Sequence, residues 1–296
     1  MKKKLLSILK KMPLFFRNPI IRNNLRLDES KIENVIFKVA DNKEELEQAY
    51  KLVHDVYLNE DYTDDNSVGL RIKLINALPN TTTFIGKIGN QVIITMTLFE
   101  DSNLKLPMDE LYNDELNQLR NQGRKIMEVG GLASHPDHRK NNQMLPTALV
   151  KIMLTYSMKY LKIDDQVIMV NPKHVWVYES LFLFEKIGMV KYYQNVKNNP
   201  AVPLKLDLRT CSEKAKKIYQ HKPFKKNLYY FLFQMNGSFI KLPKVKRPLY
   251  IWTPEMLSYF FEYKTNLFQL ADKRILAYIK EKHLMQKEFS SLRDIA

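Results

Sequence analysis

Cysteine and long apolar runs are both scarce in this chain of 296 residues. Cys211 is the only cysteine, which excludes an internal disulfide and a cysteine-based metal cluster and fits a reducing compartment. No stretch of about 18 uninterrupted apolar residues occurs, so the sequence predicts no membrane-spanning helix. The composition is otherwise that of a globular protein, because 45% of the residues are hydrophobic and can fill a core.

Glycine is also scarce, with 8 residues, and the common glycine-rich motifs are missing. GxxxxGKS/T, GxGxxG and GxSxG do not occur, so the chain shows no sign of a P-loop, a Rossmann site or a hydrolase nucleophile. HExxH is missing too, and the histidines of HPDH (135–138) lack a third credible ligand. We therefore expect no metal site.

Negative charge is scarce relative to positive charge, and the formal net charge is +15. This excess predicts an acidic partner, namely nucleic acid, an anionic membrane or an acidic protein, although a basic surface without a specific partner remains an alternative. Between residues 197 and 247, 13 lysines and arginines face only two acidic residues. No nucleic-acid-binding motif occurs, so we expect no nucleic-acid partner.

The first residues, MKKKLLSILKKMP, alternate basic and apolar positions. Leu5, Ile8 and Leu9 share a helical face surrounded by lysines, which predicts a short interfacial helix that stops at Pro13. Peripheral membrane contact through residues 1–17 and a frayed basic terminus are both compatible with this pattern.

Apolar periodicity predicts strands that alternate with helices. Asp41 is a candidate N-cap, with Glu44 in a capping-box position, and Gly89-Asn90 predicts a hairpin turn. The expected strands are 34–40, 82–88, 91–99, 125–134, 167–170, 189–196 and 201–208, and the expected helices are 41–58, 107–122, 142–161, 254–263 and 266–283. A hairpin between βα units favours an α/β (α+β) fold with a mixed sheet and helices on both faces. The expected divisions are a basic amphipathic segment 1–30, a domain 31–210 and a basic, mostly helical extension 211–296.

The strand 125–134 carries Glu128 and then the pair Gly130-Gly131. Paired glycines in a strand often mark a bulge, which leaves amide groups free to face a carbonyl oxygen, as an oxyanion site requires. A buried twist of the sheet, with Glu128 at its edge, explains the same residues.

Two further groups of residues are candidates for chemistry. Asn171 ends a strand, and His174 and Tyr178 follow at a spacing of one helical turn, where a tyrosine can protonate a leaving group. One histidine and one tyrosine on an aromatic helix are, however, more often packing residues than catalytic ones. Near residue 54, His54 precedes an acid-rich loop that includes Glu60 and could hold an amino group, but a solvated surface is the stronger interpretation.

Four segments in order resemble the GNAT acyltransferase superfamily over residues 34–208. They are AYKLVHDVYLNEDY, EVGGLASHPDHR, VNPKHVWVYESLFLFEKIG and PAVPLKLDL. The resemblance is closer to long-chain N-acyl amino acid synthases, which are related to acyl-homoserine lactone synthases. It implies a GNAT fold in which the central strand splays from its neighbour and an amine attacks a thioester directly, without an acyl-enzyme.

The resemblance also implies roles for particular residues. Glu128, Tyr178 and His54 would be catalytic, with Glu128 helping to deprotonate the amine and Tyr178 protonating the leaving thiolate. The backbone of Gly131, Leu132 and Ala133 would hold the thioester oxygen, and Asn171, His174 and Arg139 would line the acyl-donor channel.

Three departures from the superfamily pattern modify this expectation. The segment RKNNQMLP lacks the glycines that usually wrap the CoA pyrophosphate, which favours acyl carrier protein, an acidic protein, over free CoA. The expected carrier-protein docking residues are Lys214, Lys216, Lys217, Lys225 and Lys226. Gly131 replaces the arginine usual in lactone synthases, which argues against a lactone product, and Leu183 replaces a common glycine.

We therefore expect an N-acyltransferase that moves a long-chain acyl group to the amine of an amino acid or similar small molecule. Its co-substrate would be acyl-acyl carrier protein or acyl-CoA, with no bound cofactor and no metal. We expect it in the cytoplasm, with peripheral contact to the inner membrane face left open. The alternatives are a CoA-dependent GNAT N-acetyltransferase and a non-enzymatic basic protein that binds membranes or nucleic acid.

Overall fold

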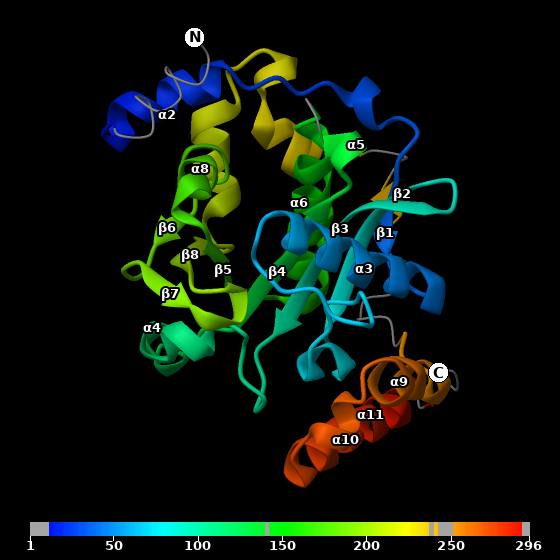
Figure 1. Cartoon of the computed structure of the whole chain (residues 1–296). Helices are drawn as coiled ribbons and strands as arrows, with labels where there is room; N and C mark the ends of the chain where they lie inside the picture. Colours follow the sequence, from blue (N-terminus) through cyan, green and yellow to red (C-terminus); the bar gives the residue numbers. More distant parts are fainter. Residues whose placement is uncertain (1–11, 140–141, 237–239, 242–250, 292–296) are drawn as a thin grey trace.

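The computed structural model describes residues 12–139, 142–236, 240–241 and 251–291. Its centre is a mixed sheet in the order β6-β8-β5-β4-β3-β2-β1-β9, with β7 paired to β8 (Figure 1). The strands are β1 (Ile36–Val39), β2 (Thr82–Ile88), β3 (Gln91–Glu100), β4 (Ile126–Ser134), β5 (Asp165–Val170), β6 (Glu185–Lys186), β7 (Lys191–Tyr193), β8 (Asn199–Asp207) and β9 (Ile240–Lys241). The predicted mixed α/β class is confirmed.

Helices cover both faces of this sheet, because successive strand residues point to opposite sides. In β2, Phe84 belongs to one core and Ile85 to the other. The first core packs against α6 (Met144–Tyr156) and α8 (Cys211–Tyr219), and the second against α3 (Lys43–Asn59) and α4 (Asp109–Asn121). Figure 1 shows α6 and α3 on opposite sides of β4.

The predicted hairpin is present, since β2 and β3 pair across Gly89, which has a φ of +56°. The start of α3 differs by one residue from the capping-box prediction. Asn42, not Asp41, is the N-cap, and its side chain accepts a hydrogen bond from the Glu45 amide at 2.9 Å. Glu45 reaches back to the Asp41 amide at 3.3 Å, so the reciprocal pattern is kept with different residues.

β4 and β5 are parallel and pair only at their N-terminal ends, from Ile126↔Asp165 to Glu128↔Val167. Beyond Glu128 the two strands have no paired residues in the described part of the chain, whereas β5 stays paired with β8 along its whole length. β4 therefore splays from β5 toward its C-terminal end. The splayed strands implied by the resemblance are present.

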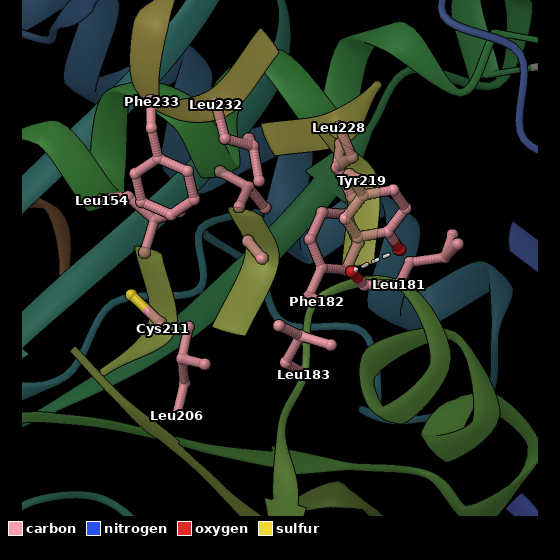
Figure 2. Close-up of a pocket in the computed structure, with 12 residues that line it drawn as sticks. Leu154, Leu181, Phe182, Leu183, Leu206, Cys211, Tyr219, Leu228, Leu232 and Phe233 are labelled. Carbon is pink, nitrogen blue, oxygen red and sulfur yellow. Dashed lines mark hydrogen bonds between the residues drawn. The ribbon is translucent and has the colours of Figure 1, made fainter. Parts of the chain in front are cut away.

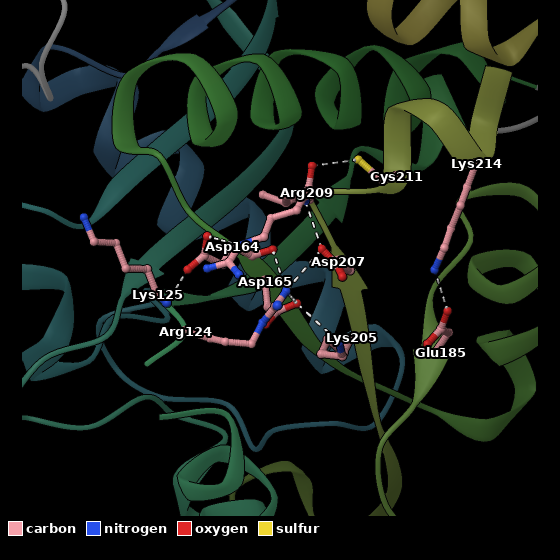
Figure 3. Close-up of polar contacts among 11 residues, drawn as sticks. Arg124, Lys125, Asp164, Asp165, Glu185, Lys205, Asp207, Arg209, Cys211 and Lys214 are labelled. Atoms are coloured by element: carbon pink, nitrogen blue, oxygen red, sulfur yellow. Dashed lines mark hydrogen bonds and ion pairs between the residues drawn. The ribbon is translucent and has the colours of Figure 1, made fainter. Parts of the chain in front are cut away.

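Ion pairs hold the other end of β4 and β5 together (Figure 3). Asp165 is fully buried and pairs with Arg124, just before β4, and with Lys205 of β8 at 3.3 Å. Arg124 also contacts Asp207 at 3.1 Å. Buried and well-bonded charges of this kind are costly to break, so this end of the strand pair is fixed.

Several helices differ from the predicted ranges. The predicted helix 142–161 is α6 followed by a π-helical turn, η3 (Ser157–Leu161), and the predicted strand 189–196 is the short β7 followed by η5 (Gln194–Val196). The predicted helix 254–263 is α9 (Pro254–Ser258) with η8 (Tyr259–Lys264). The last predicted helix is two, α10 (Leu267–Leu270) and α11 (Lys273–Ser291), because Ala271 between them is extended.

The segments outside residues 31–210 pack against the sheet domain. Phe231 of η7 (Tyr230–Gln234) lies in the first core, and Phe260 of η8 packs edge-on against Tyr50 of α3 with ring centroids 5.6 Å apart. At the other terminus, α2 (Leu14–Asn23) contacts α7 (Val175–Leu181) through an ion pair between Arg17 and Glu179 at 2.6 Å. The predicted interfacial helix before Pro13 lies outside the described residues.

Among those described, no helix has the length and apolar content needed to cross a membrane.

Candidate active site

The gap between β4 and β5 is lined by a bulge in β4. Thr97 of β3 pairs with Gly130 and Thr95 pairs with Ala133, so Gly131 and Leu132 together face a single residue of β3. Gly131 has a φ of +61°, a conformation that favours glycine, and Val53 of α3 packs beside it. The predicted bulge is confirmed. Residues 129 to 132 are only partly buried, in contrast to the fully buried residues 126 to 128.

Glu128 lies where the two strands part. Its side chain is 3% exposed and accepts a hydrogen bond from the Met108 amide at 2.7 Å. Burial raises the pKa of this carboxyl to about 8, against the opposing effect of the Met108 amide and the Lys73 ammonium. A carboxyl with a pKa near neutral pH is suited to accept a proton from an amine.

One tyrosine interacts with this carboxyl, and a second tyrosine interacts with the first. Tyr57 of α3, one turn after Val53, has a raised pKa through burial, and Glu128 adds to the rise. Burial also raises the pKa of Tyr178 in α7 to about 12, with a further contribution from Tyr57. Tyr178 is held by edge-on packing against Phe184, whose ring centroid is 5.7 Å away. It is therefore protonated at neutral pH and can donate that proton.

The splayed ends of β4 and β5 are connected by one acidic side chain. Glu60 follows α3 and contacts Arg139 of α5 (Pro136–Arg139) at 3.3 Å and Lys173 of η4 (Pro172–His174) at 3.2 Å. α5 follows β4, and η4 follows β5. All three side chains are about one-third exposed or more, so this bridge is weak compared with the buried ion pairs at the other end.

The remaining predicted residues are distributed around this centre. Asn171 ends β5, and its side chain accepts a hydrogen bond from the Lys173 amide at 3.1 Å. His174 is solvent-exposed at the start of α7. His54 is buried in α3 beside Asp55, at 3.3 Å, and Asp65, at 3.5 Å. No described contact joins His54 to Glu128.

Apolar side chains of several elements surround a small pocket (Figure 2). Its cavity volume is about 10 Å³, which is roughly the room for one water molecule, so the lining side chains nearly close it. Phe182, which packs against Tyr178 with ring centroids 6.4 Å apart, is one of its walls. The other lining residues come mainly from α6, α8 and η7 and include Leu154, Ala215, Tyr219, Leu232 and Phe233.

A comparison of the sequence with protein-family models decides which family the chain belongs to. The model of the N-acyl amino acid synthase FeeM matches residues 48–207, which is more than half of the chain. The chain belongs to the FeeM family. The solved structure of FeeM, an N-acyl amino acid synthase from uncultured soil microbes, is 28% identical, with a TM-score of 0.54 over 60% of this chain and 93% of that one.

Two other solved structures are similar at lower identity. The CoA-dependent acyl-homoserine lactone synthase BjaI is 14% identical, with a TM-score of 0.49 over 72% of this chain and 96% of that one. A mutant of the spermidine N-acetyltransferase SpeG from Vibrio cholerae is 12% identical, with a TM-score of 0.42 over 62% of this chain and 98% of that one. No curated protein matches the sequence. The predicted membership of the N-acyl amino acid synthases and the acyltransferase activity are thus confirmed by the family match.

Within this FeeM-family fold, Glu128 and the Gly131–Ala133 bulge lie on the same strand, Tyr57 interacts electrostatically with both Glu128 and Tyr178, and Glu60 brings Arg139 near Lys173. Sequence reasoning missed Tyr57, Arg71 and Lys73. Tyr57 stands one turn after Val53 in a segment already noted, and Arg71 and Lys73 alternate in GLRIKL, a spacing that places them on one side of an extended chain. Among the described residues, no group of three His, Cys, Asp or Glu side chains could hold a metal ion.

Proposed function

We propose that this FeeM-family acyltransferase moves a long-chain acyl group from acyl carrier protein to the amine of an amino acid or similar small molecule. The observation that carries the proposal is the buried Glu128 carboxyl, with its pKa raised to about 8, at the point where β4 parts from β5. The proposed catalytic unit spans residues 31–210, and residues within 211–235 and 251–279 add to its two cores.

The proposed reaction is a direct transfer. The amine nitrogen attacks the thioester carbonyl, and Glu128 takes the proton that the nitrogen loses, either directly or through water. Backbone amides of Gly131, Leu132 and Ala133 stabilise the oxyanion that forms. The carbon–sulfur bond then breaks, and the departing thiolate takes a proton from Tyr178. We keep His54 as a positioning residue for α3, since its side chain is buried within that helix's packing.

The start of α6 supports a donor without a nucleotide. In this superfamily the helix N-terminus at this place usually holds the CoA pyrophosphate with its free amides. Here the Met144 amide already donates to the Asn142 side chain at 3.2 Å, and Asn142 is tied to the Lys31 carbonyl at 3.2 Å. Pro146, two residues after Met144, has no amide hydrogen, so the turn has fewer free amides for a pyrophosphate.

Exposed lysines support an acidic carrier protein as the partner. Lys214, Lys216 and Lys217 project from α8 with solvent-accessible side chains, and Lys225 is exposed on η6 (Phe224–Lys226), beside the half-buried Lys226. Phe224, 57% exposed, lies among them. We propose this surface as the docking site, with Asn171, His174 and Arg139 along the path of the phosphopantetheine arm.

The apolar pocket beside Phe182 is the proposed site for part of the acyl chain, and its side chains must move apart to admit that chain, since the cavity volume is about 10 Å³. Its lining is almost entirely apolar, and one of its walls, Phe182, packs against Tyr178. Ala215→Leu should fill the pocket and shift preference toward shorter acyl chains. A chain-length profile identical to that of the wild type would place the acyl chain elsewhere.

The experiment that tests the function uses the purified full-length chain with long-chain acyl-acyl carrier protein, the matching acyl-CoA and acetyl-CoA. Each donor is offered with a mixture of amino acids, and acylated products are identified by mass spectrometry. We expect long-chain N-acyl amino acids from the carrier protein. Turnover of acetyl-CoA alone would support a CoA-dependent acetyltransferase instead.

The carrier-protein surface is tested separately. Reversing Lys214, Lys216, Lys217, Lys225 and Lys226 to glutamate should raise the KM for acyl-acyl carrier protein at least about tenfold. The KM for the amine should stay unchanged, and an unchanged KM for the carrier protein would move docking to another surface.

We also propose a cytoplasmic enzyme that contacts anionic membrane through residues 1–17. Leu14, Phe15 and Phe16 are 48%, 82% and 59% exposed on α2, and five lysines occur among the first eleven residues of the sequence. Sedimentation with vesicles of anionic lipid should bring down the wild type but not Phe15→Ser with Phe16→Ser. Equal sedimentation of both would remove this contact.

A further inference from the structure

Two cationic side chains lie on the segment after α3, and the reaction described above gives neither a role: Lys73 interacts electrostatically with Glu128, and Arg71 stacks on Tyr57. Arg71 lies in the loop after α3, and its guanidinium stacks on Tyr57, with the carbon centre 4.7 Å from the ring centroid. Its Nη2 donates a hydrogen bond to the Asn195 carbonyl at 3.1 Å. Lys73 follows two residues later and donates to the Tyr193 hydroxyl at 3.2 Å.

The charges of these two residues are balanced differently. The Lys73 ammonium has Glu110 at 3.9 Å. Arg71 has no carboxylate partner anywhere in the described ranges, although a guanidinium carries five N–H donors. Arg71 is only half-buried, so an incoming anion can reach it. A planar cation with free donors, connected to the proposed base through Tyr57, is suited to hold a carboxylate in two parallel hydrogen bonds.

The position of Arg71 relative to Glu128, the proposed base, agrees with the shape of an α-amino acid. Arg71 stacks on Tyr57, and Tyr57 is close enough to Glu128 for the two to interact electrostatically. Lys73 also interacts with both Arg71 and Glu128. The amine and the carboxylate of an α-amino acid are attached to the same carbon, so their binding groups must lie in one small region.

We infer that Arg71 binds the α-carboxylate of the acceptor and thereby selects α-amino acids over simple amines. Lys73 supports this subsite by keeping the region positive. The inference rests on the proposed function and deepens it, since it assigns the acceptor class to a particular side chain. Tyr57 acts as a positioning residue that keeps the guanidinium flat against its ring.

The test compares wild type, Arg71→Gln and Arg71→Lys with L-amino acids and their α-amides, all with the same saturating acyl donor. The amides keep the amine and side chain but lack the carboxylate. Arg71→Gln should raise the KM for the amino acid roughly tenfold to a hundredfold, as expected for a lost charge-assisted pair. The KM for the amide and for the donor should stay within about twofold, and Arg71→Lys, which keeps the charge but not the planar fork, should be intermediate.

Arg274→Gln is the matched control, because Arg274 is 92% exposed on α11 and should leave every constant unchanged. An equal effect on amino acid and amide, or no effect on either, overturns the inference and leaves the proposed function intact. A wild-type enzyme that prefers simple amines or amides to amino acids also overturns the inference but leaves the proposed function intact. No acylated amine from wild type with any acceptor overturns both. Thermal unfolding checks that the variants fold. If Arg71→Gln does not fold, the constants of Arg71→Lys decide the question.

Discussion

The two ends of the β4–β5 pair differ in how they are held. At the N-terminal end, Asp165 is fully buried and shared between Arg124 and Lys205. At the C-terminal end the strands have no paired residues within the described ranges, and the contact through Glu60 is exposed to solvent. One strand pair thus combines a fixed end, which sets the geometry, with an open end, which admits a substrate. Variants at the two ends should therefore separate stability from activity.

Glu128→Gln should have the largest effect on activity. It removes the proposed base but keeps the shape, so kcat should fall roughly a hundredfold to ten-thousandfold. The matched control is Glu45→Gln, another buried glutamate, which pairs with Lys38 and Lys87 away from the cleft. It should lower the unfolding temperature and leave kcat unchanged. Steady-state kinetics with wild-type kcat for Glu128→Gln would remove Glu128 from the mechanism.

The pH dependence of Glu128 sharpens the same test. Its folded-state pKa of about 8 lies above the ordinary value of 4.5, so the folded protein keeps a proton that the unfolded chain releases. The contribution of this group to stability should fall as pH rises from about 4.5 to about 8, whereas kcat should rise toward pH 8. Chemical unfolding across this range should show a smaller slope in Glu128→Gln than in wild type. An identical slope would contradict the raised pKa.

Asp165→Asn should have the largest effect on stability. It leaves Arg124 and Lys205 without their buried partner, and the expected loss is about 3–5 kcal/mol of unfolding free energy. Glu185→Gln, which breaks only the exposed pair with Lys214, is the control and should leave the denaturant midpoint unchanged. If both variants unfold at the wild-type midpoint, the N-terminal end of the strand pair is not a fixed end.

Tyr178→Phe should have an intermediate effect, confined to the open end. Without the hydroxyl the thiolate leaves unprotonated, and kcat should fall roughly tenfold to a hundredfold. An acyl donor with a more acidic thiol should restore most of the rate, because its thiolate needs no proton. Tyr192→Phe is the control, since Tyr192 is 68% exposed on β7. Failure of the acidic thiol to restore the rate would indicate a packing role for Tyr178.

Glu60→Gln should have the smallest effect. Glu60 neutralises Arg139 and Lys173 at the mouth of the gap, so its removal leaves two cations free for the donor phosphate. The KM for acyl-acyl carrier protein should fall by less than about fivefold, as suits an exposed pair. A higher KM would mean instead that Glu60 helps to order the mouth.

The sheet and the bulge could be predicted from the sequence because their signals are local. Gly89-Asn90 marks the hairpin, and Gly130-Gly131 marks the bulge where one residue needs a positive φ. The one-residue error at Asp41 arose because Asp41 and Asn42 are both good caps, and packing of the helix decides between them.

The candidate site was predicted only in part because its surroundings come from distant segments. The pKa of Glu128 is raised by burial among distant segments and is partly lowered again by the Met108 amide, 20 residues away. The position of Arg71 depends on Tyr57 and on Asn195, which lies 124 residues further along the chain. No local pattern carries such information. The break between α10 and α11 was missed for a simpler reason, since the apolar spacing continues across Ala271.

The short strand β9 has a consequence for how the chain reaches this structure. Ile240 and Lys241 pair in parallel with Phe37 and Lys38 of β1, and His283 bonds to the Ala77 carbonyl at 2.7 Å. These contacts join positions about two hundred residues apart, so they form late during synthesis. Until residue 241 emerges from the ribosome, the outer edge of β1 is open to pairing with other chains. A chain truncated after residue 236 should therefore aggregate even though its catalytic residues are complete.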